Sequence, residues 1–200
     1  MAGGTPNVKH LWIADDSGVG DPALVNETTP EYPGSVGKVG NLKESAGLRT
    51  KVLQYVKRVS TDATVAAAAG ALAYWQDDND FVVCADQTLC LGGSTAPIPA
   101  GVFLGTLPAA GKYGYIQVSG TAALICDGVQ TVDIVIGNPL WAKGADADGL
   151  ITHPTIGTDA ATIAAEILVR KQVEVGRALA AQADSSGTVA TLLTLPHNGW

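Results

Sequence analysis

The sequence predicts a mainly β protein: a small β-barrel or sandwich built from hairpins, with a long irregular N-terminal arm and one short helix. Composition is the first observation, because 24 glycines and 10 prolines among 200 residues, with abundant Thr and Val, favour strands joined by many turns. The second observation is a hairpin expected within residues 100–126, whose return strand alternates apolar and polar residues. The third is a second expected hairpin, with strands at 173–182 and 188–195 around a turn at 184–187.

The hairpin within residues 100–126 is expected to be the centre of the fold. An apolar run at 102–107 is followed by Pro108 and Gly111, which favour a turn, and the strand then returns over 113–126. The residues of one parity on the return strand are apolar and should face a core: Ile116, Val118, Ala122, Leu124 and Cys126. The residues of the other parity are polar and should face solvent or a partner: Gln117, Ser119 and Thr121.

Further strands are expected on both sides of this hairpin. Residues 48–60 alternate charged side chains with Val, Leu and Tyr; a 3.6-residue period also fits, but the β-branched content favours a strand. Residues 64–75 stay ambiguous, because their alanines favour a helix while Gly70 and the aromatic end favour a strand. Shorter strands are expected at 81–84 and 129–136.

The C-terminal third is expected to hold a loop and the one helix. Residues 137–153 contain Pro139 and a run of small polar residues, which predicts a loop. Residues 158–171 favour a helix, because Thr158 can cap its N-terminus and two basic residues at its end suit the helix dipole.

Residues 1–47 are expected to form an extended N-terminal arm, and residues 48–200 a β-rich domain. The arm is rich in glycine and proline and carries too few apolar residues to bury a core of its own. Leu11, Trp12 and Ile13 nevertheless form a large apolar cluster. An arm that lies along a partner surface explains both features; a terminus ordered only locally is the alternative.

Charge and hydrophobicity exclude several classes of protein. A formal net charge of −7 argues against nucleic-acid binding, which needs a basic surface to neutralise phosphates. With 46% hydrophobic and 16% charged residues, the chain is not intrinsically disordered. No apolar run approaches the ~20 residues that span a membrane, and the first residues lack the pattern of a signal peptide. Cys84, Cys90 and Cys126 have no CxxC spacing, which predicts reduced, buried thiols.

No catalytic residue, cofactor site or metal site is expected. His10, His153 and His197 are isolated and have no metal-ligand spacing. The acidic clusters at 77–80 and 146–148 lack the pattern of a calcium-binding loop and are interpreted as solvated turns. The motifs of a serine nucleophile elbow and of a phosphate-binding loop are not found. The chain is therefore predicted not to be an enzyme.

Aromatic residues near polar neighbours give the candidate interaction surface. Tyr113 and Tyr115 share the less apolar parity of their strand, Trp141 lies in an expected loop, and Trp75 is expected inside the core. Such aromatic residues favour protein contact surfaces. With the apolar cluster of the arm, the candidate interaction residues are Leu11, Trp12, Ile13, Tyr113, Tyr115 and Trp141.

A series of short motifs resembles a known family. In chain order they are Tyr55-Val56-Lys57, residues 65–70, Ala71-Leu72-Ala73-Tyr74-Trp75, Ala100-Gly101-Val102-Phe103-Leu104-Gly105 and residues 111–120. Over roughly residues 48–136 the sequence resembles the capsid decoration (cement) proteins of tailed bacteriophages. These motifs are structural rather than catalytic.

The resemblance implies a compact β-domain, often a homotrimer, on the outer surface of a phage head. Such a protein binds the major capsid protein and bridges neighbouring subunits, without cofactor, nucleic acid or membrane as a partner. It is made in the host cytoplasm and resides on the capsid exterior of the virion. Two alternatives are a small trimeric β-fold enzyme with a site between subunits, and another phage structural part such as a tail or fibre-base protein.

Overall fold

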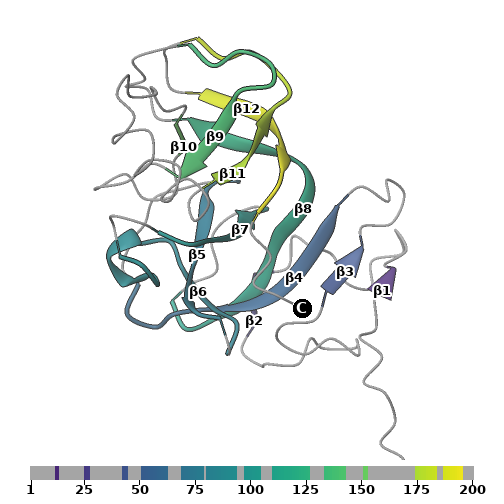
Figure 1. Cartoon of the computed structure of the whole chain (residues 1–200). Helices are drawn as coiled ribbons and strands as arrows, with labels where there is room; N and C mark the ends of the chain where they lie inside the picture. The colour runs from purple at the N-terminus through teal and green to yellow at the C-terminus, as the bar shows by residue number, and fades with distance from the viewer. Residues whose placement is uncertain are drawn as a thin grey trace, which may run out of the picture.

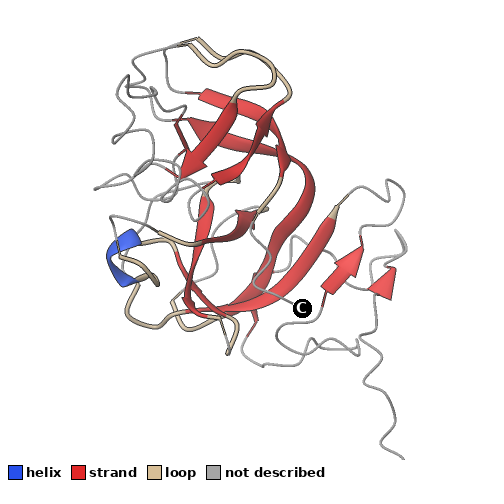
Figure 2. Cartoon of the chain, viewed as in Figure 1, coloured by secondary structure: helices blue, strands red, loops and turns tan. Residues whose placement is uncertain are grey.

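The fold was analysed in a computed structural model of the chain. The structure describes residues 51–62, 69–78, 80–93, 97–104, 110–126, 133–142, 151–152, 174–183 and 187–195, and the backbone of three strands within 12–44. In these ranges the protein is mainly β, and helical structure is limited to a short 3-10 turn, η1 (Gln87–Leu89) (Figures 1 and 2). The predicted β class, with a barrel built from hairpins, is confirmed.

Five strands close into a first barrel. They are β4 (Val52–Arg58), β5 (Leu72–Asp77), β6 (Val82–Cys84), β7 (Pro99–Phe103) and β8 (Tyr113–Cys126). Hydrogen-bonded pairing runs β4–β6–β5–β7–β8 and returns to β4. Only the β4–β6 pair in this ring is parallel. Closure leaves these strands with little unpaired edge.

The other half of β8 belongs to a second closed ring. The further strands are β9 (Pro139–Ala142), β10 (Ile151–Thr152), β11 (Glu174–Ala178) and β12 (Gly187–Leu193). Pairing runs β8–β10–β9–β11–β12 and returns to β8 through an antiparallel ladder. Figure 1 shows this second barrel above the first, with β8 running through both.

Strand β8 changes partner at a bend between the two barrels. Its ladder with β4 ends at Ser119, and its ladder with β12 begins at Gly120, which has a φ of 89°. The side-chain amide of Gln117 donates to the carbonyl oxygens of Ser119 and Thr121, over 3.0 and 2.9 Å. Because glycine adopts positive φ at little cost, Gly120 lets one strand serve both barrels, and Gln117 holds the bend.

The hydrophobic core lies in two adjoining clusters. The first fills the first barrel: Val56, Ala71, Ala73, Trp75, Val83, Ala85, Ala100, Phe103, Ile116 and Val118. The second fills the second barrel and also includes Leu72, Tyr74 and Val102 from β5 and β7. These three residues alternate with the interior residues of the first barrel. The outer face of β5 and β7 therefore supports the second core and joins the two barrels into one body.

Three short strands of the N-terminal segment extend the sheet of the first barrel. They are β1 (Trp12–Ile13), β2 (Val25–Glu27) and β3 (Leu42–Glu44). Strand β3 pairs antiparallel with β4, β1 pairs parallel with β3, and β2 pairs with β8. The sheet order therefore begins at β1, which pairs with β3 alone among the described strands.

Several expected elements are found. Strands β7 and β8 form the predicted central hairpin, and β11 and β12 the predicted C-terminal one. Strands β4 and β6 lie within the expected ranges 48–60 and 81–84, and β5 shows that the end of the ambiguous segment 64–75 is a strand, while residues 64–68 lie outside the described residues. The expected helix at 158–171 lies outside the described residues. Burial of Trp75 and of all three cysteines is confirmed.

Two expectations near the second barrel are wrong. The expected loop at 137–153 contains β9 and β10, because Leu140, Ala142 and Ile151 point into the second core although each strand is very short. The expected strand at 129–136 is reduced, in its described part, to a single bridge between Ile134 and Gln182.

Candidate interaction surfaces

The sequence-predicted Tyr113 and Tyr115 both pack against Tyr55 on the outside of the first barrel. Tyr55 lies opposite Tyr115 in the β4–β8 ladder, with ring centroids 5.0 Å apart, and Tyr113 stacks on Tyr55 at 5.9 Å. The ammonium of Lys57 lies 5.8 Å from the centroid of the Tyr113 ring, within cation–π range. Leu53 packs in the same cluster. The alternation that places Val56 and Ile116 inside the barrel puts these rings outside it.

Burial within this cluster is uneven. Tyr55 and Tyr115 are buried, whereas Tyr113 is half-buried. On the same face of β8, Gln117 is buried, Ser119 is half-buried and Thr121 is exposed, as is Ala123 beyond it. The polar parity of β8 therefore meets solvent only toward the second barrel. Tyr113 is the ring of this cluster that can contact a partner without rearrangement.

The other candidate residues lie elsewhere. Trp12 and Ile13 form β1 and pair in register with Lys43 and Glu44 of β3; Leu11 lies outside the described residues. Trp141 lies on β9, half-buried, and packs against the second core. The six candidates are thus divided among the arm, the outside of the first barrel and the second barrel.

A surface that the sequence did not indicate lies on the second barrel. Among the described residues, five large apolar side chains are exposed, and four of them belong to one region: Val135, Ile136, Leu179 and Leu192. In the strand expected over residues 129–136, Ile136 shares the parity of Ile134, and the two side chains should face the same side. Instead a turn begins at Ile136, and its side chain is 70% exposed while Ile134 is fully buried. The Gly-Asn pair that follows was the available signal for this turn.

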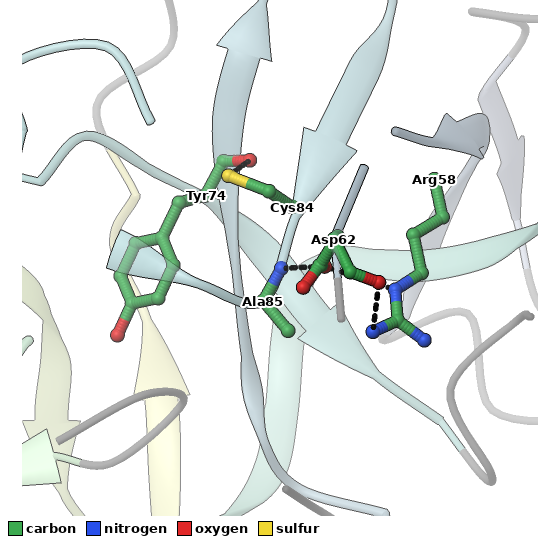
Figure 3. Close-up of polar contacts among 5 residues, drawn as sticks. All are labelled: Arg58, Asp62, Tyr74, Cys84 and Ala85. Atoms are coloured by element: carbon green, nitrogen blue, oxygen red, sulfur yellow. Dashed lines mark hydrogen bonds and ion pairs between the residues drawn. The ribbon is translucent and has the colours of Figure 1, made fainter. Parts of the chain in front are cut away.

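A buried ion pair lies at the end of β4 (Figure 3). The Arg58 Nε donates to the Asp62 carboxylate over 2.9 Å, and the same oxygen accepts the backbone N–H of Ala85 over 2.7 Å. Nearby, the Cys84 thiol lies 3.7 Å from the carbonyl oxygen of Tyr74. Because the carboxylate joins the end of β4 to the residue after β6, its role is structural: it fixes the turn that follows β4.

The thiols are in protected surroundings. All three cysteines are buried and unpaired by disulfides, and the Cys90 thiol donates to the carbonyl oxygen of Gln87 over 3.0 Å. Burial raises the pKa of the Cys90 thiol above its ordinary value. Within the described ranges, no group of three or more His, Cys, Asp or Glu side chains is arranged to hold a metal ion. No helix in those ranges has the length and apolar character to cross a membrane.

Similarity of this chain to known proteins is limited to solved structures. No protein-family model matches the chain, and no curated protein sequence matches it. Among solved structures, the chain is similar to the N base of the head fiber gp8.5 in bacteriophage phi29, with 17% sequence identity and a TM-score of 0.38. That alignment covers 72% of this chain and 94% of the other.

Proposed function

We propose that this protein is a structural component of a tailed-phage particle, and specifically a cement protein of its head. In this proposal it binds the outer surface of the capsid as a homotrimer and bridges neighbouring major capsid protein subunits, without enzymatic activity. The resemblance of residues 48–136 to capsid decoration proteins supports it. The proposal rests on these sequence motifs and on the sheet geometry.

The position of β1 is the observation that carries the proposal. The strands of both barrels are closed on themselves, whereas β1 ends the sheet order and pairs only with β3 among the described strands. A terminal strand can extend its pairing to an added strand of a partner, in the manner of β-augmentation. Trp12 and Ile13 are the two residues of this strand. A coat-protein segment laid along β1 would gain both backbone hydrogen bonds and apolar contact.

In this proposal, tight binding to the capsid comes from several copies of the chain acting together. A two-residue strand offers few contacts, and one such contact would dissociate readily. Three copies joined in a trimer convert later binding steps into intramolecular ones, which raises the avidity by about 10²–10⁴. A trimer whose three β1 strands pair with different coat subunits therefore bridges them.

The first test is location. Mass spectrometry of purified heads and separated tails should find the chain with the heads, in a fixed ratio to the major capsid protein. Recovery of the chain with tails alone would instead favour a tail or fibre-base part. If the chain is not found in purified particles, the proposal that it is a structural component of the particle is wrong.

The second test is the arm. Heads from which this protein has been removed should bind the full-length variant Trp12→Asp at least tenfold more weakly than they bind wild type. The matched control is Leu91→Asp, which likewise replaces a large apolar residue by a carboxylate, at an exposed position on the loop after η1. This control should bind like wild type. Equal binding by all three proteins would show that β1 makes no contact with the coat protein.

A further inference from the structure

A hydrogen-bonded ribbon of two chain segments extends from the second barrel. Residues 134–138 run antiparallel to residues 178–182, in the segments before β9 and after β11 that lie side by side in Figure 1. Ile134 and Gln182 exchange both backbone hydrogen bonds, at 2.8 and 2.9 Å. Gly137 donates to Ala178 over 2.8 Å, and Ala178 donates to Asn138 over 3.0 Å. These N–H and carbonyl groups are therefore already hydrogen-bonded between the two segments. A partner would contact the ribbon through its side chains.

The exposed side chains of the ribbon are apolar. Val135 is 52% exposed, Ile136 70% and Leu179 44%. Leu192 on β12 is 43% exposed and continues the same surface, because Leu179 hydrogen-bonds to Ala190, two residues before it. We call Val135, Ile136, Leu179 and Leu192 the apolar patch. Four large apolar side chains gathered in water are unusual for a surface that binds nothing.

The patch is held in shape before any partner arrives. Val135 donates its N–H to the Asn138 side-chain oxygen over 2.8 Å, and its carbonyl accepts the Asn138 N–H over 3.1 Å. Ile134 and Ala178 anchor the base of the ribbon in the second core. Little conformational entropy is then lost when the patch is covered, which favours binding.

Among the described residues, those around the patch carry almost no net charge. Arg177, which lies opposite Leu192 on β11, is paired with Glu174 at 3.5 Å. The other outward residues of this face are small and uncharged: Thr121, Ala123, Thr188 and Ala190. Asp133 is the one further charge beside the ribbon in the described part of the chain. The whole chain, in contrast, carries a net charge of −7.

We propose that a second copy of this chain covers the apolar patch. Two copies of an acidic protein repel each other least where each presents a neutral surface, and burial of apolar area drives their association there. The small residues around Leu192 allow the two surfaces to approach closely. The inference rests on the proposed homo-oligomer, whose contact surface it names, and is independent of binding to heads.

Sedimentation of the full chain tests this inference. Wild type should form an oligomer, and Ile136→Asp should raise its dissociation constant at least a hundredfold. Leu179→Asp, a second variant within the patch, should act in the same way. The control Leu91→Asp should sediment like wild type, because Leu91 is the exposed large apolar residue of the described part that lies outside the patch. Matching circular dichroism and melting temperatures establish that all four proteins are folded.

Salt gives an independent readout. Raising NaCl from about 0.1 M to about 1 M shortens the Debye length from about 10 Å to about 3 Å and screens the repulsion between acidic copies. Association through the apolar patch should therefore tighten with salt, whereas weakening would overturn the proposal. An oligomer unchanged in both patch variants would overturn the assigned surface and leave the homo-oligomer standing. A wild-type monomer whose Ile136→Asp variant loses head binding would assign the patch to the coat protein and overturn self-association.

Discussion

Removal of the Asp62 carboxylate is expected to destabilise the first barrel strongly. In Asp62→Ala, the Arg58 guanidinium remains buried without its 2.9 Å partner, and the Ala85 N–H loses its 2.7 Å acceptor. Breaking a buried ion pair by removing one partner costs about 3–5 kcal/mol, much of it because the remaining charge stays desolvated. Since domains of this kind are stable by about 5–15 kcal/mol, the variant should lose a large share of its free energy of unfolding.

Equilibrium urea unfolding, followed by tryptophan fluorescence, measures this loss directly, because Trp75 is buried in the first core. Asp80→Ala is the matched control: it removes an exposed aspartate and should change the free energy of unfolding by less than about 0.5 kcal/mol. The double variant Arg58→Met/Asp62→Leu replaces the pair by apolar side chains and should be more stable than Asp62→Ala. A loss below about 1 kcal/mol in Asp62→Ala would refute this interpretation of the pair.

Three further outcomes are expected. Gly70→Ala should lower the free energy of unfolding by more than about 2 kcal/mol in urea titrations, because φ is +96° and the added Cβ would lie 2.5 Å from the Ala123 carbonyl oxygen. Gly137→Ala, at φ +88° with nothing within 4 Å of the added Cβ, should lower the free energy of unfolding by only about 1 kcal/mol. Equal losses in the two variants would show that the contact with the Ala123 carbonyl oxygen does not matter. Cys90 should resist iodoacetamide near pH 8 in the native protein and react in urea, since burial raises its thiol pKa; rapid native labelling in mass spectra would contradict this. For the same reason stability should fall at alkaline pH, where the unfolded thiol ionises first and releases its proton; a free energy of unfolding from urea titrations that stays constant or rises there would contradict it.

The elements that could be predicted from sequence are those with local signals. The β7–β8 hairpin was predictable because alternation over residues 113–126 has the period of a strand, and the C-terminal hairpin because turn residues separate two apolar runs. Burial of Trp75 followed from its size and apolar neighbours. These features depend on residues close together in the chain.

The closure of the sheet could not be predicted, because it depends on pairs distant in sequence. Strand β8 pairs with β4 before its bend and with β12 after it. This change of partner allows one strand to belong to both barrels. β9 and β10 are too short to show a period. Gln117 is polar and was expected at a surface, but its side-chain amide donates hydrogen bonds to two carbonyl oxygens at the bend of β8.

The candidate interaction residues were predictable only as residue types. An aromatic residue on an outward parity can be exposed, as Tyr113 is in part, or covered, as Tyr115 is, and the alternation does not distinguish the two. The apolar patch was missed for another reason: Ile136 follows the parity of Ile134 in sequence, and alternation alone does not show the turn that exposes it. That turn is held by the local bonds between Val135 and Asn138 and by the bond from Gly137 to Ala178, some forty positions later.

A cryo-electron microscopy map of the intact head is the most direct test that this chain is a capsid-bridging protein. We expect density for the two barrels on the outer surface, in copies grouped about a local symmetry axis, with β1 against the coat protein. Density for the chain only in the tail, or a head surface that lacks it in particles shown to contain it, would contradict the proposed function.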